Sequence, residues 1–254
     1  MKLTSVTVGA PNWTEVATSD PAAAKAFYAE LLGWRAETDP RPDAGGYTVM
    51  YLGDAPAAGL SPLYGPEQHT AWTVSFATED TDATVAKVTG AGGRVLMAPM
   101  EVLDVGRFAV VADPAGAVFS LWQARAFAGA GVLNAPGALG WVELLTRDTE
   151  GARAFYPEVF GWTVGAGDSY TQWGVDGADF GGMTAMGDQF PLELAPHWLP
   201  YFAVADVDLT TGRAGSLGGE VLMPPATVPD GPRIAVLSDP QGAVFGVYLA
   251  APSG

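Results

Sequence analysis

The feature that most constrains this chain is an internal repeat that covers nearly its whole length. The segment WTEVATSDPAAAKAFYAELLGW at 13–34 matches WVELLTRDTEGARAFYPEVFGW at 141–162, with an offset of 128 residues. Toward the end of each copy, ADPAGAVFSLW matches SDPQGAVFGVY with an offset of 126, as Asp113 and Asp239 show. The offset changes only in segments rich in Gly, Pro and Asp, which places the insertions in loops. The sequence therefore predicts two homologous halves of about 125 residues each.

The domain boundaries are predicted from where the two copies begin and end. We expect a first domain at residues 1–123, a linker at 124–138 and a second domain at 139–254. The linker has the sequence ARAFAGAGVLNAPGA, whose small and turn-forming residues are typical of a connection. Hydrophobic residues make up 48% of the chain, which is enough to build a substantial core.

Each half contains two similar units, and each unit has a strand, a helix and then further strands. In the first unit, Ser19 or Asp20 can cap the helix, because its side-chain oxygen accepts from a free N–H of the first turn. Gly33 can end that helix in a left-handed conformation. The matching helix of the second half contains Pro157, so we expect a break or kink there. The predicted fold class is α+β, with four tandem βαβββ units.

Charge and hydropathy exclude several classes of partner. The chain has 28 acidic and 12 basic residues, for a formal net charge of -16. This charge would repel the phosphates of nucleic acids and anionic lipid headgroups, so we expect neither nucleic acid nor membrane as a partner. No apolar run reaches the ~18–20 residues of a membrane span, and the N-terminal segment lacks the apolar stretch of a signal peptide. We therefore expect a cytoplasmic protein.

The repeated pattern resembles the vicinal oxygen chelate superfamily of glyoxalases, bleomycin-resistance proteins and extradiol dioxygenases. The resemblance rests on SDPAAAKAFYAELLGW and RDTEGARAFYPEVFGW, and on the endings DPAGAVFSLW and DPQGAVFGVY. It covers nearly the whole chain as two glyoxalase-like domains. More narrowly, the chain is similar to a two-domain actinobacterial group labelled "hydroxylase" or "glyoxalase-like". The resemblance implies two half-open barrels, each with its ligand on the concave face.

The resemblance also implies three metal-ligand positions in each domain of metal-dependent members. In this chain those six positions hold Trp13, Thr73, Ser120, Trp141, Leu199 and Gly246. An indole nitrogen is only a donor and cannot bind a cation, whereas Zn, Fe or Mn needs three or four N or O ligands. The chain has no cysteine, so thiolate ligands are also excluded. We therefore expect no metal and no other cofactor.

Strand alternation predicts which side chains line the concave faces. If position 13 faces the barrel interior, every second residue of its strand does so too, and the last strand of each domain follows the same rule. The inward-facing residues are then Trp13, Glu15, Ser120 and Trp122 in the first half, and Trp141, Glu143 and Tyr248 in the second. Each concave face should therefore be aromatic and hold one carboxylate.

Four further residues are candidates for ligand binding. Arg107 and Arg233 occupy matching positions in a strand that leads into the barrel wall, and His69 and His197 precede the fifth strand of each half. Simpler interpretations stay open. The histidines can be loop residues at the barrel rim, and the arginines can be partners of the two inward glutamates. Tyr47 and Tyr170 are also repeated, and we interpret them as packing residues.

Three functions are consistent with these residues. We favour metal-independent binding of a small, apolar or aromatic, natural-product-like molecule, because planar ligands pack well on Trp and Tyr rings. Such binding would serve sequestration, resistance or sensing. The alternative is a cofactor-free tailoring or reactive-carbonyl enzyme, with Glu15 or Glu143 as the general base, since burial beside indoles raises a carboxyl pKa. A metal-dependent dioxygenase or glyoxalase is the least favoured function.

Two questions stay open at the level of sequence. The tryptophans at positions 13 and 141 can line a groove, or they can fill the barrels and form core. Four units in one chain can complete the barrels internally, so a monomer and a homodimer are both consistent with the sequence.

Overall fold

The computed structural model describes residues 7–167, 170–229 and 231–249. The first half contains one sheet, two α-helices and a short 3-10 helix. These elements are β1 (Pro11–Thr18), α1 (Pro21–Leu32), β2 (Arg35–Thr38), η1 (Pro42–Ala44), β3 (Thr48–Leu52), β4 (Ala55–Pro62), β5 (Ala71–Ala77), α2 (Thr81–Gly90), β6 (Arg94–Val102), β7 (Gly106–Ala112) and β8 (Val118–Ala124).

The second half repeats this order of strands and α-helices. Its elements are β9 (Leu139–Thr146), α3 (Thr149–Phe160), β10 (Thr163–Ala166), β11 (Thr171–Val175), β12 (Ala178–Ala185), β13 (His197–Val204), α4 (Val207–Ser216), β14 (Glu220–Thr227), β15 (Arg233–Ser238) and β16 (Val244–Leu249). No helix among the described residues is both long and apolar enough to cross a membrane.

Both sheets have eight strands in equivalent order. The first runs β2-β3-β4-β1-β5-β8-β7-β6, and the second runs β10-β11-β12-β9-β13-β16-β15-β14. Each sheet mixes parallel and antiparallel pairs, and neither sheet closes on itself. The predicted α+β fold of four βαβββ units in two half-open barrels is therefore confirmed. The exact boundaries 1–123, 124–138 and 139–254 stay a prediction.

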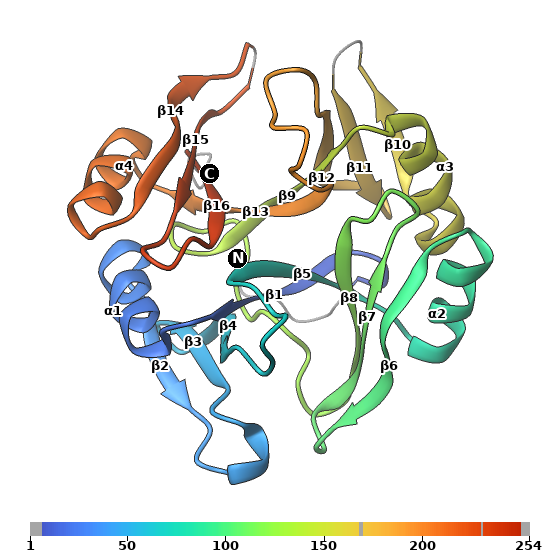
Figure 1. The fold of residues 1–254 in the computed structure, drawn as a ribbon, viewed down its shortest axis with the longest axis horizontal. Helices are drawn as coiled ribbons and strands as arrows, with labels where there is room; N and C mark the ends of the chain where they lie inside the picture. The colour runs from blue at the N-terminus through green and yellow to red at the C-terminus, as the bar shows by residue number, and fades with distance from the viewer. Residues whose placement is uncertain (1–6, 168–169, 230, 250–254) are drawn as a thin grey trace.

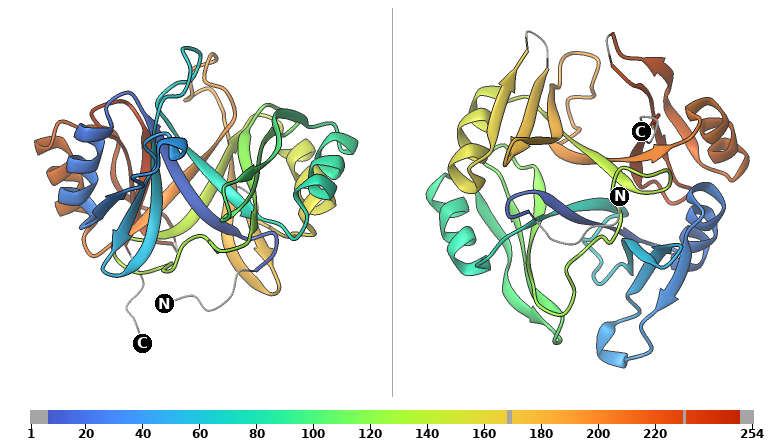
Figure 2. Two further views of the ribbon diagram at one scale, coloured as in Figure 1. Left: turned by 90° about the horizontal axis from the view of Figure 1, so that it is seen from below. Right: turned by 180° about the vertical axis from the view of Figure 1, so that it is seen from behind.

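The two domains pack back to back through their central strands. In Figure 1, β1 and β5 run beside β9 and β13 across the middle of the molecule, and the outer strands of each sheet curl away from the other domain. Helix α1 packs beside α4, and α2 packs beside α3. Seen from below, the sheets lie between these two helix pairs (Figure 2). The concave face of each sheet is therefore turned away from the domain interface.

The helix ends follow the predicted local chemistry. Asp20 caps α1, because its side chain accepts from the backbone N–H groups of Ala22 and Ala23. Gly33 ends the helix in the left-handed conformation with φ of 75°. Asp148 and Gly161 play the same two parts for α3.

The predicted break at Pro157 is wrong. Helix α3 continues through this residue to Phe160, and the backbone N–H of Gly161 donates to the carbonyl of Pro157. The missing N–H of Pro157 removes one i→i−4 hydrogen bond, and only the last turn of α3 follows this residue. The neighbouring Phe155 and Tyr156 are buried in the core, and such packing supplies most of the stability of a helix in a protein.

The convex faces and the helices enclose one hydrophobic core that both domains share. Much of this core is aromatic. The FY and GW residues that mark the repeat lie within it, together with one Trp from β5 and one from β13. These core residues are Phe27, Tyr28, Trp34, Trp72, Phe155, Tyr156, Trp162 and Trp198.

Two crossed hydrogen bonds join the domains inside this core. The hydroxyl of Tyr28 donates to Oδ2 of Asp239 at 3.0 Å, and the hydroxyl of Tyr156 donates to Oδ2 of Asp113 at 3.0 Å. Each tyrosine therefore binds the aspartate of the other domain's DPxG turn. Burial raises the pKa of both aspartates, while backbone N–H groups and the tyrosine hydroxyls oppose that shift. The repeated tyrosines and aspartates thus contribute buried polar contacts to the domain interface.

Removing either tyrosine hydroxyl should destabilise the whole chain. Tyr28→Phe or Tyr156→Phe leaves a buried carboxylate oxygen without its donor, and a tryptophan N–H loses its acceptor. We expect each substitution to lower the free energy of unfolding by about 1–3 kcal/mol in urea denaturation. Tyr51→Phe is the control, because the Tyr51 ring contacts Arg35 on the neighbouring strand instead. An equal loss in the control would contradict this role of the interface.

Candidate functional site

The concave face of the first barrel carries Trp13 and Glu15 on β1, as strand alternation predicted. The residues between and beyond them, Thr14 and Val16, are fully buried on the other side. Gly59 on β4 lies opposite Glu15. A Cβ atom at Gly59 would lie 2.2 Å from the hydroxyl oxygen of Tyr47, so glycine is required for the close approach of this ring.

A chain of hydrogen bonds connects three of these side chains. Nε1 of Trp13 donates to the Tyr47 hydroxyl at 2.9 Å, and that hydroxyl donates to Oε2 of Glu15 at 3.0 Å. Burial raises the pKa of Glu15, and the hydrogen bond from Tyr47 partly opposes the rise. Burial and the nearby Glu15 charge raise the pKa of Tyr47 well above its usual value. Tyr47 therefore acts as a neutral donor, a role beyond packing that the sequence-based interpretation missed.

The linker contributes an aromatic ring to the first barrel. The ring of Phe127 packs edge to face on Trp13, with 4.9 Å between centroids and 87° between planes. Its centroid lies 6.1 Å from that of Trp122, whose Nε1 donates to the Phe127 carbonyl at 2.9 Å. Trp13 is only 5% exposed. Phe127 thus lies in contact with both Trp13 and Trp122, and strand alternation did not predict its presence in the barrel.

Ser120 lies on the floor of the first barrel. Its hydroxyl forms a hydrogen bond with that of Ser75 on β5, and both side chains are buried. The prediction that Ser120 points inward fits this contact. Its hydroxyl is already engaged by the protein, so it is less available to a ligand.

The second barrel repeats the Trp–Tyr hydrogen bond, but its glutamate accepts from different hydroxyl groups. Nε1 of Trp141 donates to the Tyr170 hydroxyl at 2.9 Å. Oε2 of Glu143 accepts from the Tyr201 hydroxyl at 2.8 Å, and Oε1 accepts from Oγ1 of Thr184 at 2.7 Å. Burial first, and then the charge of Glu143, raises the pKa of both tyrosines. Glu143 is therefore a fixed acceptor surrounded by hydroxyl donors.

Tyr201 takes the space that the two serines occupy in the first barrel. It lies opposite Gly246, the counterpart of Ser120. A Cβ atom at Gly246 would lie 2.1 Å from the Tyr201 ring, so this ring requires glycine on the adjacent strand. The sequence did contain a signal for the change, because a Ser–Ser pair in one half is replaced by a Tyr–Gly pair in the other.

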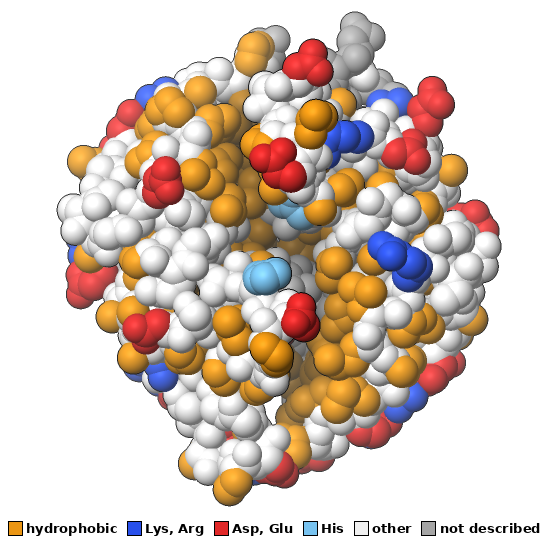
Figure 3. Space-filling view, viewed as in Figure 1, with side chains coloured by type: hydrophobic (Ala, Val, Ile, Leu, Met, Phe, Trp, Pro, Cys, Tyr) orange, Lys and Arg blue, Asp and Glu red, His pale blue; other side chains and the backbone are white. Residues whose placement is uncertain are grey.

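An apolar cluster lines the second barrel and is separate from the shared core. We call it the second-barrel cluster. Its buried members are Leu145, Met186, Leu199 and Tyr201, with Trp141, Phe190, Ile234, Val236, Val244 and Tyr248 packed around them. Trp141 and Tyr248 are half-buried, so the predicted aromatic lining is present here. Figure 3 shows a hollow with hydrophobic side chains along its walls in each half of the face seen in Figure 1.

The two histidines have different surroundings. His69 is exposed in the connection between β4 and β5. His197 begins β13, is half-buried, and lies opposite Leu145 of the second-barrel cluster. Its Nδ1 lies 2.9 Å from the Ala195 carbonyl and donates to it, so Nε2 is the ring nitrogen that this contact does not use. Figure 3 shows both histidines near the middle of that face.

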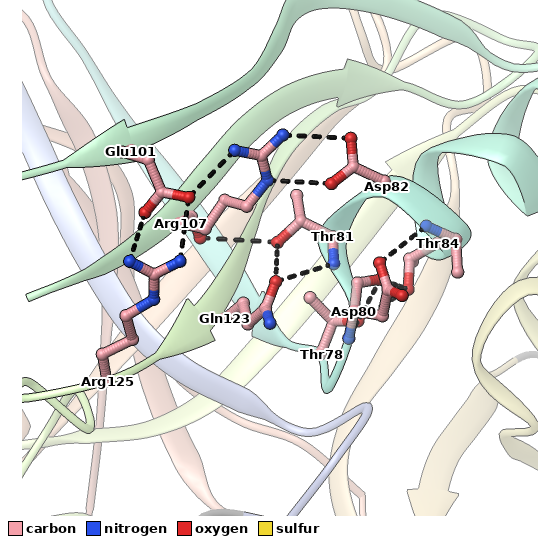
Figure 4. A network of polar contacts seen from close by, with 10 residues as sticks. Thr78, Asp80, Thr81, Asp82, Thr84, Glu101, Arg107, Gln123 and Arg125 are labelled. Carbon is pink, nitrogen blue, oxygen red and sulfur yellow. Dashed lines mark hydrogen bonds and ion pairs between the residues drawn. The ribbon is translucent and has the colours of Figure 1, made fainter.

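The two arginines are held outside the barrels. Arg107 forms ion pairs with Asp82 on α2 and Glu101 on β6, as Figure 4 shows. Arg233 forms an ion pair with Asp208 on α4. The structure therefore does not bring the arginines together with the inward residues, and the two inward glutamates are bound by hydroxyl groups instead.

The side chains in the barrels do not match the requirements of a metal ion. The family's ligand positions hold indole, hydroxyl and aliphatic groups, while Zn, Fe and Mn need several imidazole, carboxylate or thiolate donors in one shell. Within residues 7–167, 170–229 and 231–249, no three His, Asp or Glu side chains are grouped so that they could hold a metal ion. We therefore derive no chemical step through a metal.

Comparison with known families gives one match in each half of the chain. The model of the glyoxalase/bleomycin resistance protein/dioxygenase superfamily matches residues 10–121 and 138–247. These two matches correspond to the two barrels.

Two groups of relatives match nearly the whole chain. Mycobacterium tuberculosis CFP32, whose name gives it as a candidate glyoxylase, is 40% identical over 254 residues, covering 96% of each chain. The anthracycline biosynthesis protein DnrV of Streptomyces peucetius is 41% identical over 263 residues, covering 96% of this chain and 94% of the relative.

Solved structures share the fold at low sequence identity. The Mn(II)-bound glyoxalase from Novosphingobium aromaticivorans has a TM-score of 0.68 and 17% identity, covering 96% of this chain and 82% of the other. The 2,3-dioxygenase LapB from Pseudomonas sp. KL28 has a TM-score of 0.66 and 15% identity, covering 95% and 93%. These likenesses concern the fold alone.

The burial of Glu15 predicts a pH dependence of stability. Its folded-state pKa lies above the unfolded value, so between the two the folded protein binds the extra proton, and the stability contributed by this group falls as pH rises. Glu15→Gln removes the charge, so the variant should gain stability relative to wild type as the pH rises from the ordinary glutamate pKa through the raised one. Each unit of pKa difference corresponds to about 1.4 kcal/mol.

Urea unfolding at several pH values measures this difference. Glu158→Gln, which changes an exposed residue on α3, is the control and should show no comparable trend. A Glu15→Gln variant that loses stability relative to wild type as pH rises would contradict the burial of a costly carboxylate.

Proposed function

This chain belongs to the glyoxalase/bleomycin resistance protein/dioxygenase superfamily, but its described residues include no matching set of metal ligands. We therefore propose that it binds a small aromatic molecule on a concave barrel face without a metal. The observation that carries the proposal is the second-barrel cluster. It is an apolar surface inside a half-open barrel, separate from the core that stabilises the fold.

The physical basis is the burial of apolar surface. Trp141 and Tyr248 are only half-buried, so a planar molecule placed against them removes their exposed area from water. Such burial is worth roughly 25 cal/mol per Å². Aromatic side chains also favour edge-to-face or offset contacts with an aromatic ligand, which supports a planar ring system over a flexible aliphatic chain.

Polar groups within the apolar wall would orient the ligand. A carboxylate has about four lone-pair positions, and the hydroxyl groups of Thr184, Tyr201 and Tyr170 occupy at most three of them at Glu143. Glu143 can therefore accept a further hydrogen bond from a ligand hydroxyl. Nε2 of His197 offers a second polar atom near the same apolar wall. A few polar groups in an apolar surround are typical of small-molecule sites.

The chemistry of the relatives agrees with such a ligand. DnrV carries a name that places it in anthracycline biosynthesis, and anthracyclines contain a planar, hydroxylated anthraquinone. We propose a hydroxylated polycyclic natural product as the ligand class, with sequestration, sensing or presentation to another enzyme as the role. The net charge of -16 supports a small-molecule partner over nucleic acid.

Titration with 1,4-dihydroxyanthraquinone tests the proposal. We expect quenching of tryptophan fluorescence with a Kd on the order of micromolar. Glu143→Gln should weaken binding about 10-fold or more, because it replaces a charged acceptor. Glu158→Gln is the matched control and should bind as wild type does. Absence of quenching together with an unchanged melting temperature would show that the proposed binding is wrong.

Chelation tests the metal-independent part separately. Dialysis against EDTA should leave the Kd for the anthraquinone unchanged, since no step of the proposed binding uses a metal. Loss of binding after dialysis, with recovery on adding Mn²⁺ or Zn²⁺, would overturn this part while leaving the binding itself in place.

Cofactor-free acid–base catalysis is a second candidate function. The observation in its favour is the raised pKa of Glu15, since a carboxyl shifted toward neutrality is better suited to accept a proton. Methylglyoxal turnover in the presence of EDTA provides the test. Turnover that survives EDTA and is lost in a folded Glu15→Gln variant would support this function, and turnover retained by the variant would exclude Glu15 as the base.

A further inference from the structure

The two barrels differ most clearly in the space beside their inward tryptophans. In the first barrel this space holds the ring of Phe127, edge to face on Trp13 at 4.9 Å. The backbone N–H of Phe127 donates to the carbonyl of Val105 at 3.1 Å, and its carbonyl accepts from Trp122. Hydrogen bonds at the backbone N–H and C=O of Phe127 hold the residue in place, and Trp13 and Trp122 pack against its ring.

In the second barrel, no ring among the described residues lies edge to face on the inward tryptophan. Trp141 is half-buried, and the rings of Phe190, Tyr201 and Tyr248 share its cluster without forming such a contact with it in the described part of the chain. Tyr248, the counterpart of Trp122, contacts Asn134 through its hydroxyl at 3.2 Å. The sequence position that corresponds to Phe127 at the offset of 126 is Ser253, and the sequence LAAPSG at 249–254 contains no aromatic residue.

We infer that Phe127 takes in the first barrel the place that a ligand ring takes in the second. The inference rests on the function proposed above and deepens it. The second barrel alone binds the ligand, with an aromatic ring edge to face on Trp141. In the first barrel the chain supplies this ring itself, so a ligand would have to displace it.

The position of Glu143 narrows the class of ligand. Trp141 and Glu143 point to the same face of β9 and are two residues apart, which is roughly 6.5 Å along a strand. A ligand that contacts the indole and also donates to the carboxylate therefore extends beyond a single ring. A fused, planar ring system with a phenolic hydroxyl meets both requirements, whereas a single-ring phenol meets only one of them well.

Binding stoichiometry tests the inference directly. Isothermal titration calorimetry with 1,4-dihydroxyanthraquinone should give one site per wild-type chain and two sites in Phe127→Ala. Two sites in wild type, or one site in a folded Phe127→Ala variant, would overturn the inference but leave the proposed function standing. No binding by wild type would sink the proposed function and this inference with it.

A matched pair of blocking variants keeps the test decisive if Phe127→Ala does not fold. Val118 and Val244 are equivalent residues at the start of β8 and β16, and both sit on the concave side of their strands with partial exposure. Val244→Trp should raise the Kd at least about 10-fold by filling the second barrel, and Val118→Trp should leave it within about 2-fold. The reverse pattern, or equal weakening by both, would overturn the assignment to the second barrel.

Discussion

The structure depends on the crossed hydrogen bonds between each tyrosine of the FY motif and the aspartate of the other domain's DPxG turn. Tyr28 reaches Asp239 and Tyr156 reaches Asp113 inside a core of stacked aromatic rings. Each hydroxyl also accepts from a tryptophan, Trp72 or Trp198. Since these groups are buried, their mutual satisfaction fixes how the two domains lie against one another. The same tyrosine and aspartate therefore occur in both halves, because each half supplies one partner for the other.

The convex face of each sheet packs in the shared core, and the concave face carries the candidate site. The FY and GW residues of the repeat lie in the core between the convex faces, whereas the concave faces keep the Trp–Tyr contact of each half and differ elsewhere. The contrast between the two barrels shows this freedom. Ser75 and Ser120 pair on one floor, whereas Tyr201 covers Gly246 on the other, with no change in strand order. Two copies of one fold thus present two different surfaces.

The sequence predicted the fold well and the site only in part. Repeat spacing, helix caps and strand alternation correctly placed the two sheets, and the inward direction of Trp13, Glu15 and Ser120 fits the observed contacts. Alternation cannot reveal what comes from elsewhere in the chain, so Phe127 in the linker and Thr184 on β12 were missed. Arg107 and Arg233 looked like site residues because they repeat, but they repeat as partners of Asp82 and Asp208 on the outer helices. The predicted break at Pro157 was wrong, because α3 ends three residues later and its buried face packs in the core.

The covalent attachment of Phe127 has a consequence for how duplicated sites diverge. A ring carried by a short segment of the same chain acts at an effective concentration on the order of millimolar or more, and it never diffuses away. A free metabolite at a lower concentration competes poorly with the Phe127 ring for the space beside Trp13. If the second barrel binds the ligand as we propose, a single aromatic residue in the linker is enough to make two copies of one fold differ in what they can bind.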